Sequence, residues 1–245
     1  MTNSKIVWID IGTHFGQEYK SIFSYKTYFI WKLFRRFVAS KLLFQGEFIT
    51  FSQLINLNKD RHNLKKNKGL FHFTFVEANP KILQMKVYSE GNDVFCLALG
   101  ENQGNNFQIG KLYHVGKDQT SQGNSIYKSK SNVSIDDFTT CLIKNPMSFA
   151  LEYKNYLDHL YSNYKIVLRV NCEGSEDEII YAFKKCFEGK FTHIFGSLKD
   201  VRTVKGSKSY EKMILFIKEN KLNYVNFSSS VLTWPSAFLK LSKMI

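Results

Sequence analysis

Short apolar runs alternate with segments of helical periodicity along most of the chain, and no other feature limits the possible folds as strongly. The runs that predict strands cover residues 5–11, 71–77, 94–99, 166–171, 192–195, 224–227 and 231–234. Residues 177–187 and 209–220 predict helices, because their apolar side chains recur on one face. Strands separated by helices are typical of a layered α/β fold with a largely parallel sheet.

The length and the cysteines indicate one cytoplasmic domain. The chain has 245 residues, of which 44% are hydrophobic, so a sizeable core can form. The cysteines lie far apart without a Cys-x-x-Cys pair, at Cys96, Cys141, Cys172 and Cys186. This spacing is typical of reduced core cysteines and indicates neither a disulfide framework nor a zinc site. We expect a single domain over residues 1–245.

Most of the net charge of +13 lies in residues 20–68. This segment holds eleven basic residues against Glu47 and Asp60, so it carries nine of the thirteen charges. Apolar residues at 30, 33, 34, 37 and 38 predict a basic amphipathic helix within it. Three roles remain open for that helix: packing on the domain with its charges solvated, closing over a substrate as a lid, and lying on a membrane surface.

A glycine-bearing turn follows the first predicted strand directly. The sequence Asp10-Ile11-Gly12-Thr13-His14-Phe15-Gly16 ends that strand and leads into a helix that opens at Gln17. Glycines in such a turn let the backbone bend sharply and approach a cofactor at the carboxyl end of a parallel strand. The spacing matches neither the dinucleotide fingerprint nor a P-loop.

The next two predicted strands also end in informative residues. The second ends in Glu77, followed by Ala78-Asn79-Pro80, and the third in Ala98-Leu99-Gly100. A carboxylate at the end of the second strand can accept hydrogen bonds from both ribose hydroxyls of an adenosine-containing cofactor. The strand ends together favour a nucleotide-type cofactor site.

In this order, the motifs resemble those of the FkbM-type S-adenosylmethionine-dependent methyltransferases. Residues 10–16 match the family's Asp-Ile-Gly-Ala-Asn-x-Gly loop, residues 77–80 its Glu-Pro-Asn-Pro, and residues 98–104 its Ala-Leu-Gly turn. Residues 123–125 resemble its Gly-Ser-Ser stretch, residues 134–138 its Thr-Leu-Asp-Asp segment, and residues 169–176 its Lys-x-Asp-x-Glu-Gly-x-Glu. The six pieces cover most of the chain.

The resemblance implies a class I, Rossmann-like methyltransferase fold, with a seven-stranded, mostly parallel sheet, helices on both faces and residues 20–68 as a basic helical insertion. It implies S-adenosyl-L-methionine as cofactor and S-adenosyl-L-homocysteine as product. The residues expected to contact the cofactor are Asp10, Gly12, Thr13, Gly16, Glu77, Ala78, Asn79, Ala98 and Leu99. The chain departs from the family pattern at His14 (for Asn), Ala78 (for Pro), Arg169 (for Lys) and Asn171 (for Asp).

Methyl transfer to a hydroxyl requires that the acceptor is aligned with the cofactor and that a proton is removed. The acceptor is expected above the carboxyl ends of the central strands, where the candidate catalytic residues are His14, Arg169, Asn171 and Glu173, with Glu176 nearby. An amide cannot act as a base, so Asn171 is expected to orient a hydroxyl or the cofactor. Glu173 or His14 is then the proton acceptor. An amide is also a weaker metal ligand than a carboxylate, and we expect no metal.

Several of these residues also have a structural interpretation. Ser175 could be the N-cap of a helix, with Glu178 completing a capping box, and His14 could be a loop histidine bonded to backbone. Asp136 and Asp137 could cap a following helix. By contrast, a carboxylate at a strand end has little structural purpose, so Asp10 and Glu77 are expected to be functional. Two further histidines lie in apolar strands and are expected in the core or at an edge: His72 and His193.

The resemblance implies O-methylation of a sugar hydroxyl, in surface polysaccharide or glycolipid biosynthesis. A phosphorylated or nucleotide-linked sugar would also suit the basic segment, since Arg and Lys complement phosphate oxygens. Two other classes remain open. One is an RNA methyltransferase in which residues 20–68 bind phosphates and stack on bases, although the sequence has no separate RNA-binding module. The other is a catalytically degenerate methyltransferase fold that serves as a binding subunit.

Overall fold

A computed structural model describes residues 4–24, 30, 51–101, 107–117, 119–120, 122–226 and 240–245. The chain divides into two compact units. The larger unit holds residues 1–15 and 72–224, and the smaller unit holds residues 16–71 and 225–245. The expectation of one domain over residues 1–245 stays a prediction.

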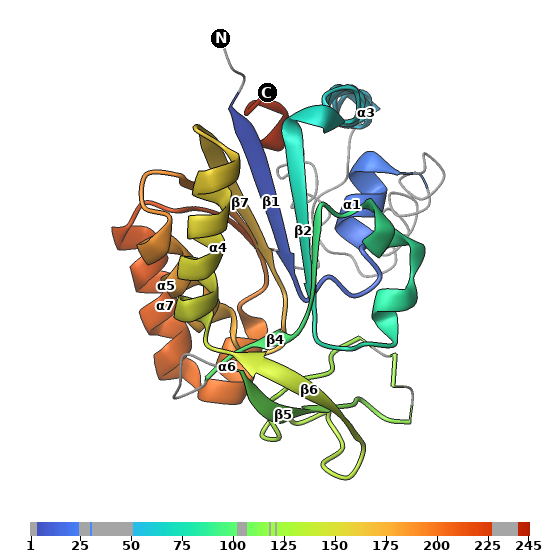
Figure 1. The fold of residues 1–245 in the computed structure, drawn as a ribbon, viewed down its shortest axis with the longest axis vertical. Coiled ribbons are helices and arrows are strands. Elements are labelled where there is room, and N and C mark those ends of the chain that lie inside the picture. The colour runs from blue at the N-terminus through green and yellow to red at the C-terminus, as the bar shows by residue number, and fades with distance from the viewer. Residues whose placement is uncertain are drawn as a thin grey trace. The chain divides into compact units, whose positions relative to one another are not determined.

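A six-stranded sheet forms the core of an α/β fold in the larger unit, consistent with a Rossmann-like arrangement (Figure 1). Its strands, in spatial order, are β3 (Asp93–Cys96), β2 (Phe71–Glu77), β1 (Lys5–Ile11), β7 (Tyr164–Val170), β8 (Phe191–Gly196) and β9 (Asn223–Asn226). The pairs β1–β7, β2–β3 and β7–β8 are parallel. β2 is buried along its whole length, which is typical of parallel strands covered on both faces. The strands predicted at 5–11, 71–77, 166–171, 192–195 and 224–227 are confirmed, with ends that differ by at most two residues.

The prediction of a single strand over residues 94–99 is wrong. β3 belongs to the main sheet, whereas β4 (Ala98–Leu99) pairs with β6 (Phe138–Lys144) in a separate three-stranded sheet that also holds β5 (Gln108–Tyr113). The reason is the length of the neighbouring strand. β2 ends at Glu77, whose carbonyl accepts a hydrogen bond from Leu97 N at 3.1 Å, and the next residue pairs with Ile143 of β6.

Helices α4 (Pro146–Leu160), α5 (Glu176–Cys186), α6 (Lys199–Lys205) and α7 (Ser207–Glu219) follow β6. The predictions for α5 and α7 are confirmed, but α4 was not predicted. It begins at Asn145, whose side chain accepts from the N–H groups of Met147 and Ser148, with Pro146 in its first turn. Buried residues of α4, α5 and α7 share one core with β1 and β7, and Figure 1 shows these helices gathered on one side of the sheet.

Two expected elements lie outside the described residues. The strand at 231–234 is one of them, so the seventh strand of the sheet stays a prediction. The basic amphipathic helix over 30–38 is the other, apart from Ile30. Of the segment 20–68, the structure describes residues 20–24, 30 and 51–68.

Basic side chains cap a helix in the smaller unit, which contains α1 (Gln17–Phe23), α3 (Phe51–Lys66) and the 3₁₀ helix η1 (Lys68–Leu70). Arg61 of α3 is 5% exposed, and it donates from Nε to the carbonyl of Ser21 at 2.9 Å and from Nη2 to that of Ser24 at 3.4 Å. Lys65 Nζ lies 3.3 Å from the Ser24 carbonyl. The last carbonyls of a helix lack helical partners and attract cations. Arg61 is therefore a buried basic residue that binds the end of α1.

Candidate functional site

The strand order places a crossover between β1 and β7. From β1 the chain continues to β2 and β3 on one side, and it later returns to β7 and β8 on the other side. Ligands of open α/β sheets bind outside the carboxyl ends of the strands at such a point. The turns that follow β1, β2 and β7 therefore form the candidate site.

Asp10 and Arg169 are direct neighbours across β1 and β7. Their side chains are 0% and 6% exposed, and Arg169 Nη1 lies 3.1 Å from Asp10 Oδ1. The same nitrogen donates to the carbonyls of Gly12 at 2.6 Å and Ile11 at 3.4 Å. Buried charges persist in proteins when they are paired in this way. The carboxylate of Asp10 thus has a structural role, which the sequence argument had discounted, while the cofactor contact of Asp10 and the catalytic role of Arg169 stay predictions.

The glycine turn after β1 packs closely against the end of β7. Gly12 has φ +71°, and a Cβ at this position would lie 2.2 Å from the carbonyl oxygen of Asn171. The N–H groups of Gly12 and Thr13 donate to the carbonyl of Val76 at 2.9 and 3.3 Å. Thr13 Oγ1 donates to the carbonyl of Asp10 at 2.7 Å. The turn is fixed between β2 and β7, and the approach of β7 itself requires the glycine.

Glu77, at the end of β2, holds two turns by their backbone. His14 N donates to Oε2 and Asn79 N to Oε1, both at 2.9 Å. Burial raises the pKa of Glu77, and hydrogen bonds from the backbone of Asn79, His14 and Ala78 oppose the shift, as does the charge of Arg169. A carboxylate offers about four acceptor positions, so capacity for a ribose hydroxyl remains beyond these three donors. The residue fits the expected cofactor role in addition to its structural one.

The other expected cofactor contacts lie in the packed interior around this turn. Asn79 is fully buried; its Nδ2 donates to the carbonyl of Gln119 at 2.6 Å, and its Oδ1 accepts the backbone N–H two residues further on at 3.0 Å. Ala98 and Leu99 are 8% and 2% exposed within β4. Ala78 packs against the cluster that contains Ala98. The structure therefore brings the ends of β2 and β4 together.

His14 is a loop histidine bonded to backbone, as its structural interpretation predicted. It has a left-handed backbone with φ +50°, and its carbonyl accepts from Tyr88 OH at 2.6 Å. Its Nε2 lies 2.9 Å from the carbonyl oxygen of Thr120. Because a carbonyl only accepts, Nε2 carries the proton, and Nδ1 is the basic nitrogen of the neutral ring. Gly16, two residues further on, is the N-cap of α1 at φ +60°.

The turn after β7 carries a buried ion pair. Glu173, at φ +65°, pairs through Oε2 with Nζ of Lys130, and this Nζ also donates to the carbonyl of Gly123 at 2.7 Å. Burial raises the pKa of Glu173, and Lys130 opposes the shift. Asn171 Nδ2 lies 3.5 Å from Glu173 Oε1. The sequence singled out Asn171 and Glu173 but missed Lys130, whose only signal was its place a few residues after the motif at 123–125.

That motif reaches the same turn. Ser125 is fully buried, and its Oγ donates to the carbonyl of Glu173 at 2.7 Å. Four segments that are distant in sequence therefore contact one another at the crossover: 12–14, 77–79, 123–125 and 171–173. All four belong to motifs that carry the family resemblance.

The capping box expected around Ser175 is wrong. Ser175 is the N-cap of α5, but its side chain makes no capping hydrogen bond, and Glu178 pairs with Lys205. Instead, the carboxylate of Glu176 accepts the three successive backbone N–H groups of residues 172–174, at 2.7–2.9 Å. Burial raises the pKa of Glu176 to about 7. The helix start is thus stabilised by a buried carboxylate that folds back onto the preceding turn.

The remaining sequence candidates lie elsewhere. β6 begins at Phe138, so a helix-capping role for Asp136 and Asp137 is wrong. His193 is half-buried and stacks on Phe195, as expected for a core or edge residue. His72 is 3% exposed in β2, also as expected.

His72 belongs to a polar network that the sequence did not indicate. Its Nε2 lies 2.7 Å from Asp93 Oδ2, and its Nδ1 lies 2.9 Å from Tyr161 OH. Tyr153 OH donates to Asp93 Oδ2 at 2.6 Å, and Tyr156 OH donates to Asp93 Oδ1 at 3.2 Å. Burial alone would raise the pKa of Asp93, but the hydrogen bonds from His72, Tyr153 and Tyr156 hold it below its ordinary value.

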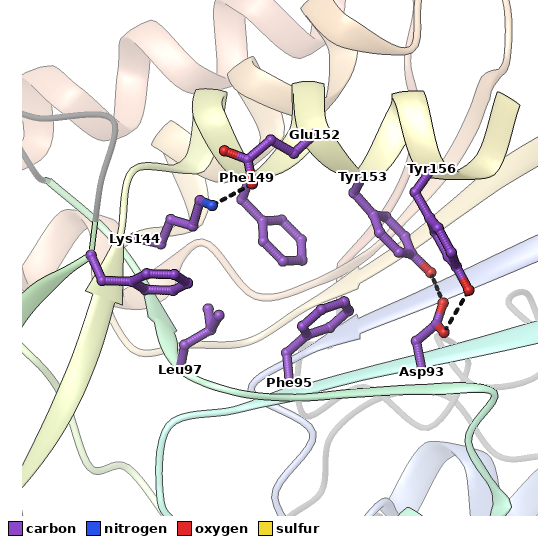
Figure 2. A pocket seen from close by; sticks show the side chains of 9 residues that line it. Asp93, Phe95, Leu97, Lys144, Phe149, Glu152, Tyr153 and Tyr156 are labelled. Carbon is purple, nitrogen blue, oxygen red and sulfur yellow. Dashed lines mark hydrogen bonds and ion pairs between the residues drawn. The ribbon is translucent and has the colours of Figure 1, made fainter. Parts of the chain in front are cut away.

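A pocket of about 500 Å³ opens beside this network (Figure 2). It is lined by Asp93, Phe95, Leu97, Phe107, Lys144, Phe149, Glu152, Tyr153 and Tyr156. Figure 2 shows side chains of α4 projecting toward Phe95 and Leu97, which follow Asp93 in the chain. The pocket was not predicted. The aromatic residues at 149, 153 and 156 recur at helical spacing, and this pattern would have indicated one aromatic face of a helix.

No protein-family model, curated protein or solved structure matches this chain. Among the described residues, none of the helices combines the length and the hydrophobicity needed to cross a bilayer. The same part of the chain holds no group of three or more His, Cys, Asp or Glu residues placed to bind a metal ion.

Proposed function

We propose that this protein is an S-adenosylmethionine-dependent O-methyltransferase with a class I, Rossmann-like fold. The observation that carries the proposal is the contact among four motif segments at the crossover of the sheet. Gly12 meets Asn171, Glu77 holds the backbone of His14, and Ser125 holds the backbone of Glu173. The strand order β3-β2-β1-β7-β8 supports a ligand at this position.

Each candidate residue then has a stated task. When bound, the cofactor would supply a methyl group on a positively charged sulfur. Glu77 would accept a hydrogen bond from one of its ribose hydroxyls. Asn171 would orient the acceptor hydroxyl, and Glu173 or Nδ1 of His14 would take its proton. Burial raises the pKa of Glu173 and so makes its carboxylate a stronger base than an exposed one.

The family resemblance supports a sugar hydroxyl as acceptor, in the assembly of a surface polysaccharide or glycolipid. A phosphorylated or nucleotide-linked sugar is the form we propose, because the segment 20–68 carries most of the net charge. An enzyme of this kind would work in the cytoplasm, with a peripheral membrane contact through residues 20–68 when its acceptor is lipid-linked.

Calorimetric titration with S-adenosylmethionine and S-adenosylhomocysteine tests the cofactor site. We expect saturable binding of both, weakened at least about tenfold by Glu77→Gln, since a charged acceptor is lost. Glu188→Gln is the matched control, because that side chain lies just past the C-terminal end of α5 and is 82% exposed. Thermal melts show whether both variants fold. Absence of binding to the folded protein, or unchanged binding in Glu77→Gln, contradicts the proposed site.

Turnover tests the chemistry separately. Nucleotide-linked sugars and RNA are offered with the cofactor, and methyl transfer is followed by mass spectrometry. We expect transfer to a sugar hydroxyl, and we expect Glu173→Gln to lower turnover while cofactor binding is kept. Transfer to RNA alone supports the RNA methyltransferase, and cofactor binding without transfer to any acceptor supports the degenerate binding subunit.

A further inference from the structure

The pocket beside α4 has one anionic end and an aromatic middle. Asp93 lies at one end, and the pair Lys144–Glu152 lies at the other, with Phe95 and Phe149 between them (Figure 2). Its volume of about 500 Å³ suits a small organic ligand. None of its residues belongs to the turns assigned to the proposed methyltransferase site, so a ligand of this pocket is independent of that function.

The aromatic rings of the pocket form a connected stack. Phe95 contacts Phe149 and Tyr153 edge to face, with ring centroids 5.2 and 5.7 Å apart. Tyr153 stacks on Phe149 and on Tyr156, each at a centroid distance of 5.7 Å. The faces of such rings carry negative partial charge and attract cations, most strongly where water is excluded.

The charges that line the pocket favour a cation as well. Glu152 pairs with Lys144, so these two groups cancel. His72 holds the buried side of the Asp93 carboxylate: its Nε2 lies 2.7 Å from Asp93 Oδ2, and its Nδ1 lies 2.9 Å from Tyr161 OH. Among the described residues, no lysine or arginine pairs with Asp93, whose pKa is held below its ordinary value by hydrogen bonds from His72 and the two tyrosines against the effect of burial. Its Oδ2 accepts from His72 and Tyr153, whereas its Oδ1 accepts from Tyr156 among the described residues, which leaves an acceptor position on Oδ1.

We propose that this pocket binds a small organic ammonium ion, with the cationic nitrogen beside Asp93 and the apolar body against the exposed surfaces of Phe95 and Phe149. The carboxylate supplies the opposite charge, and the rings of Tyr153 and Tyr156 supply cation–π attraction next to it. An anionic ligand would have to displace Glu152 from Lys144, and a neutral ligand would make no ionic contact with Asp93. The ligand chemistry is therefore set by Asp93 and the aromatic stack together.

Three probes that share one aromatic body test the proposal on the unaltered protein: benzyltrimethylammonium, benzyl alcohol and phenylacetate. Affinities are measured by saturation-transfer NMR titration. We expect benzyltrimethylammonium to bind at least about tenfold more tightly than benzyl alcohol, and phenylacetate more weakly than both. Equal binding of the ammonium and the alcohol, or stronger binding of phenylacetate, overturns the proposal.

Variants at the rim locate the probe. Tyr156 is 44% exposed, so replacing it perturbs the fold little. Tyr156→Leu removes the ring and should weaken benzyltrimethylammonium about fivefold, whereas Tyr156→Phe keeps the ring and should bind within about twofold of the native protein. Asp93→Asn should abolish the preference for the ammonium over the alcohol, provided a thermal melt shows it folded. Unchanged binding in Tyr156→Leu overturns the proposal.

S-adenosylmethionine is itself a cation, and a competition experiment separates the two sites. We expect that it leaves the NMR signal of bound benzyltrimethylammonium unchanged. Full displacement assigns the pocket to the cofactor and overturns a separate ammonium site. Failure of cofactor binding in the calorimetric test would leave the probe series intact, so the two proposals fail independently.

Discussion

The close approach of the glycine turn to β7 makes Gly12→Ala a sharp perturbation. The new Cβ would lie 2.2 Å from the carbonyl oxygen of Asn171 and 2.9 Å from its carbonyl carbon. This oxygen would have to withdraw by about 1 Å to reach an ordinary contact distance. This movement is restricted, because the N–H of Asn171 donates a hydrogen bond to the carbonyl of Ile11 at 3.1 Å.

The loss in unfolding free energy caused by Gly12→Ala has two contributions, and a matched variant separates them. Gly12 and Gly116 have nearly the same backbone angle, φ +71° and +69°, but a Cβ on Gly116 would meet nothing within 4 Å. Gly116→Ala therefore costs only the left-handed strain, about 1 kcal/mol. Gly12→Ala adds overpacking against a backbone carbonyl, about 1–3 kcal/mol. The expected loss in unfolding free energy is about 2–4 kcal/mol for Gly12→Ala.

Urea unfolding followed by circular dichroism measures both variants against the native protein. A loss for Gly12→Ala that exceeds that for Gly116→Ala by more than about 1 kcal/mol fits the reasoning. Equal losses in the two variants would refute it, since they would mean that the turn is not fixed against β7. A crystal structure of Gly12→Ala would then show where the turn moved.

Three other substitutions test interactions inside one unit or the other. Arg169→Met leaves Asp10 buried without its partner and should lower the free energy of unfolding by about 3–5 kcal/mol, and adding Asp10→Asn should recover part of the loss; no recovery in urea unfolding would argue against the pair. Lys154, Lys190 and Tyr164 hold the pKa of Asp158 below its ordinary value against the effect of burial, so its contribution is present above pH 4 or so and is lost as the pH falls further. Asp158→Asn should thus lower the free energy of unfolding by about 1 kcal/mol at pH 7. In urea unfolding at about pH 2, the difference between the variant and the native protein should become smaller, and a difference that stays constant with pH would contradict the ion pairs. Arg61→Met removes charged hydrogen bonds from two helix-end carbonyls and should lower the unfolding free energy by about 2 kcal/mol, more than Lys65→Met does; the reverse order in thermal melts would refute this capping role.

The central strands could be predicted from the sequence because each is a local apolar run buried on both faces. The boundary between β3 and β4 could not, since it depends on where β2 ends and on a partner strand some forty residues away. α4 was missed for a different reason. Its signals are local and were overlooked: its buried residues recur at helical spacing, and the Asn145 cap and Pro146 mark its start.

In the candidate site, too, local motifs could be predicted from the sequence, whereas contacts with distant residues could not. The motifs named the residues that the crossover brings together, because the carboxyl ends of neighbouring parallel strands must meet at one edge. The ion-pair partners that come from distant parts of the chain could not be predicted from the sequence: Lys130 for Glu173, and Arg169 for Asp10. The capping box failed because Glu178 pairs with Lys205, a partner that lies far away in the sequence. The start of the helix is instead held by Glu176, which accepts the N–H groups of the preceding turn.

The pairing of Asp10 with Arg169 also bears on how sequences of this kind can diverge. Opposite positions of β1 and β7 hold the two charges, and each occupies the interior only while the other is present. A lineage that lost one would carry a destabilised intermediate until the second changed. In related chains, the residues at these two positions should therefore covary rather than change independently.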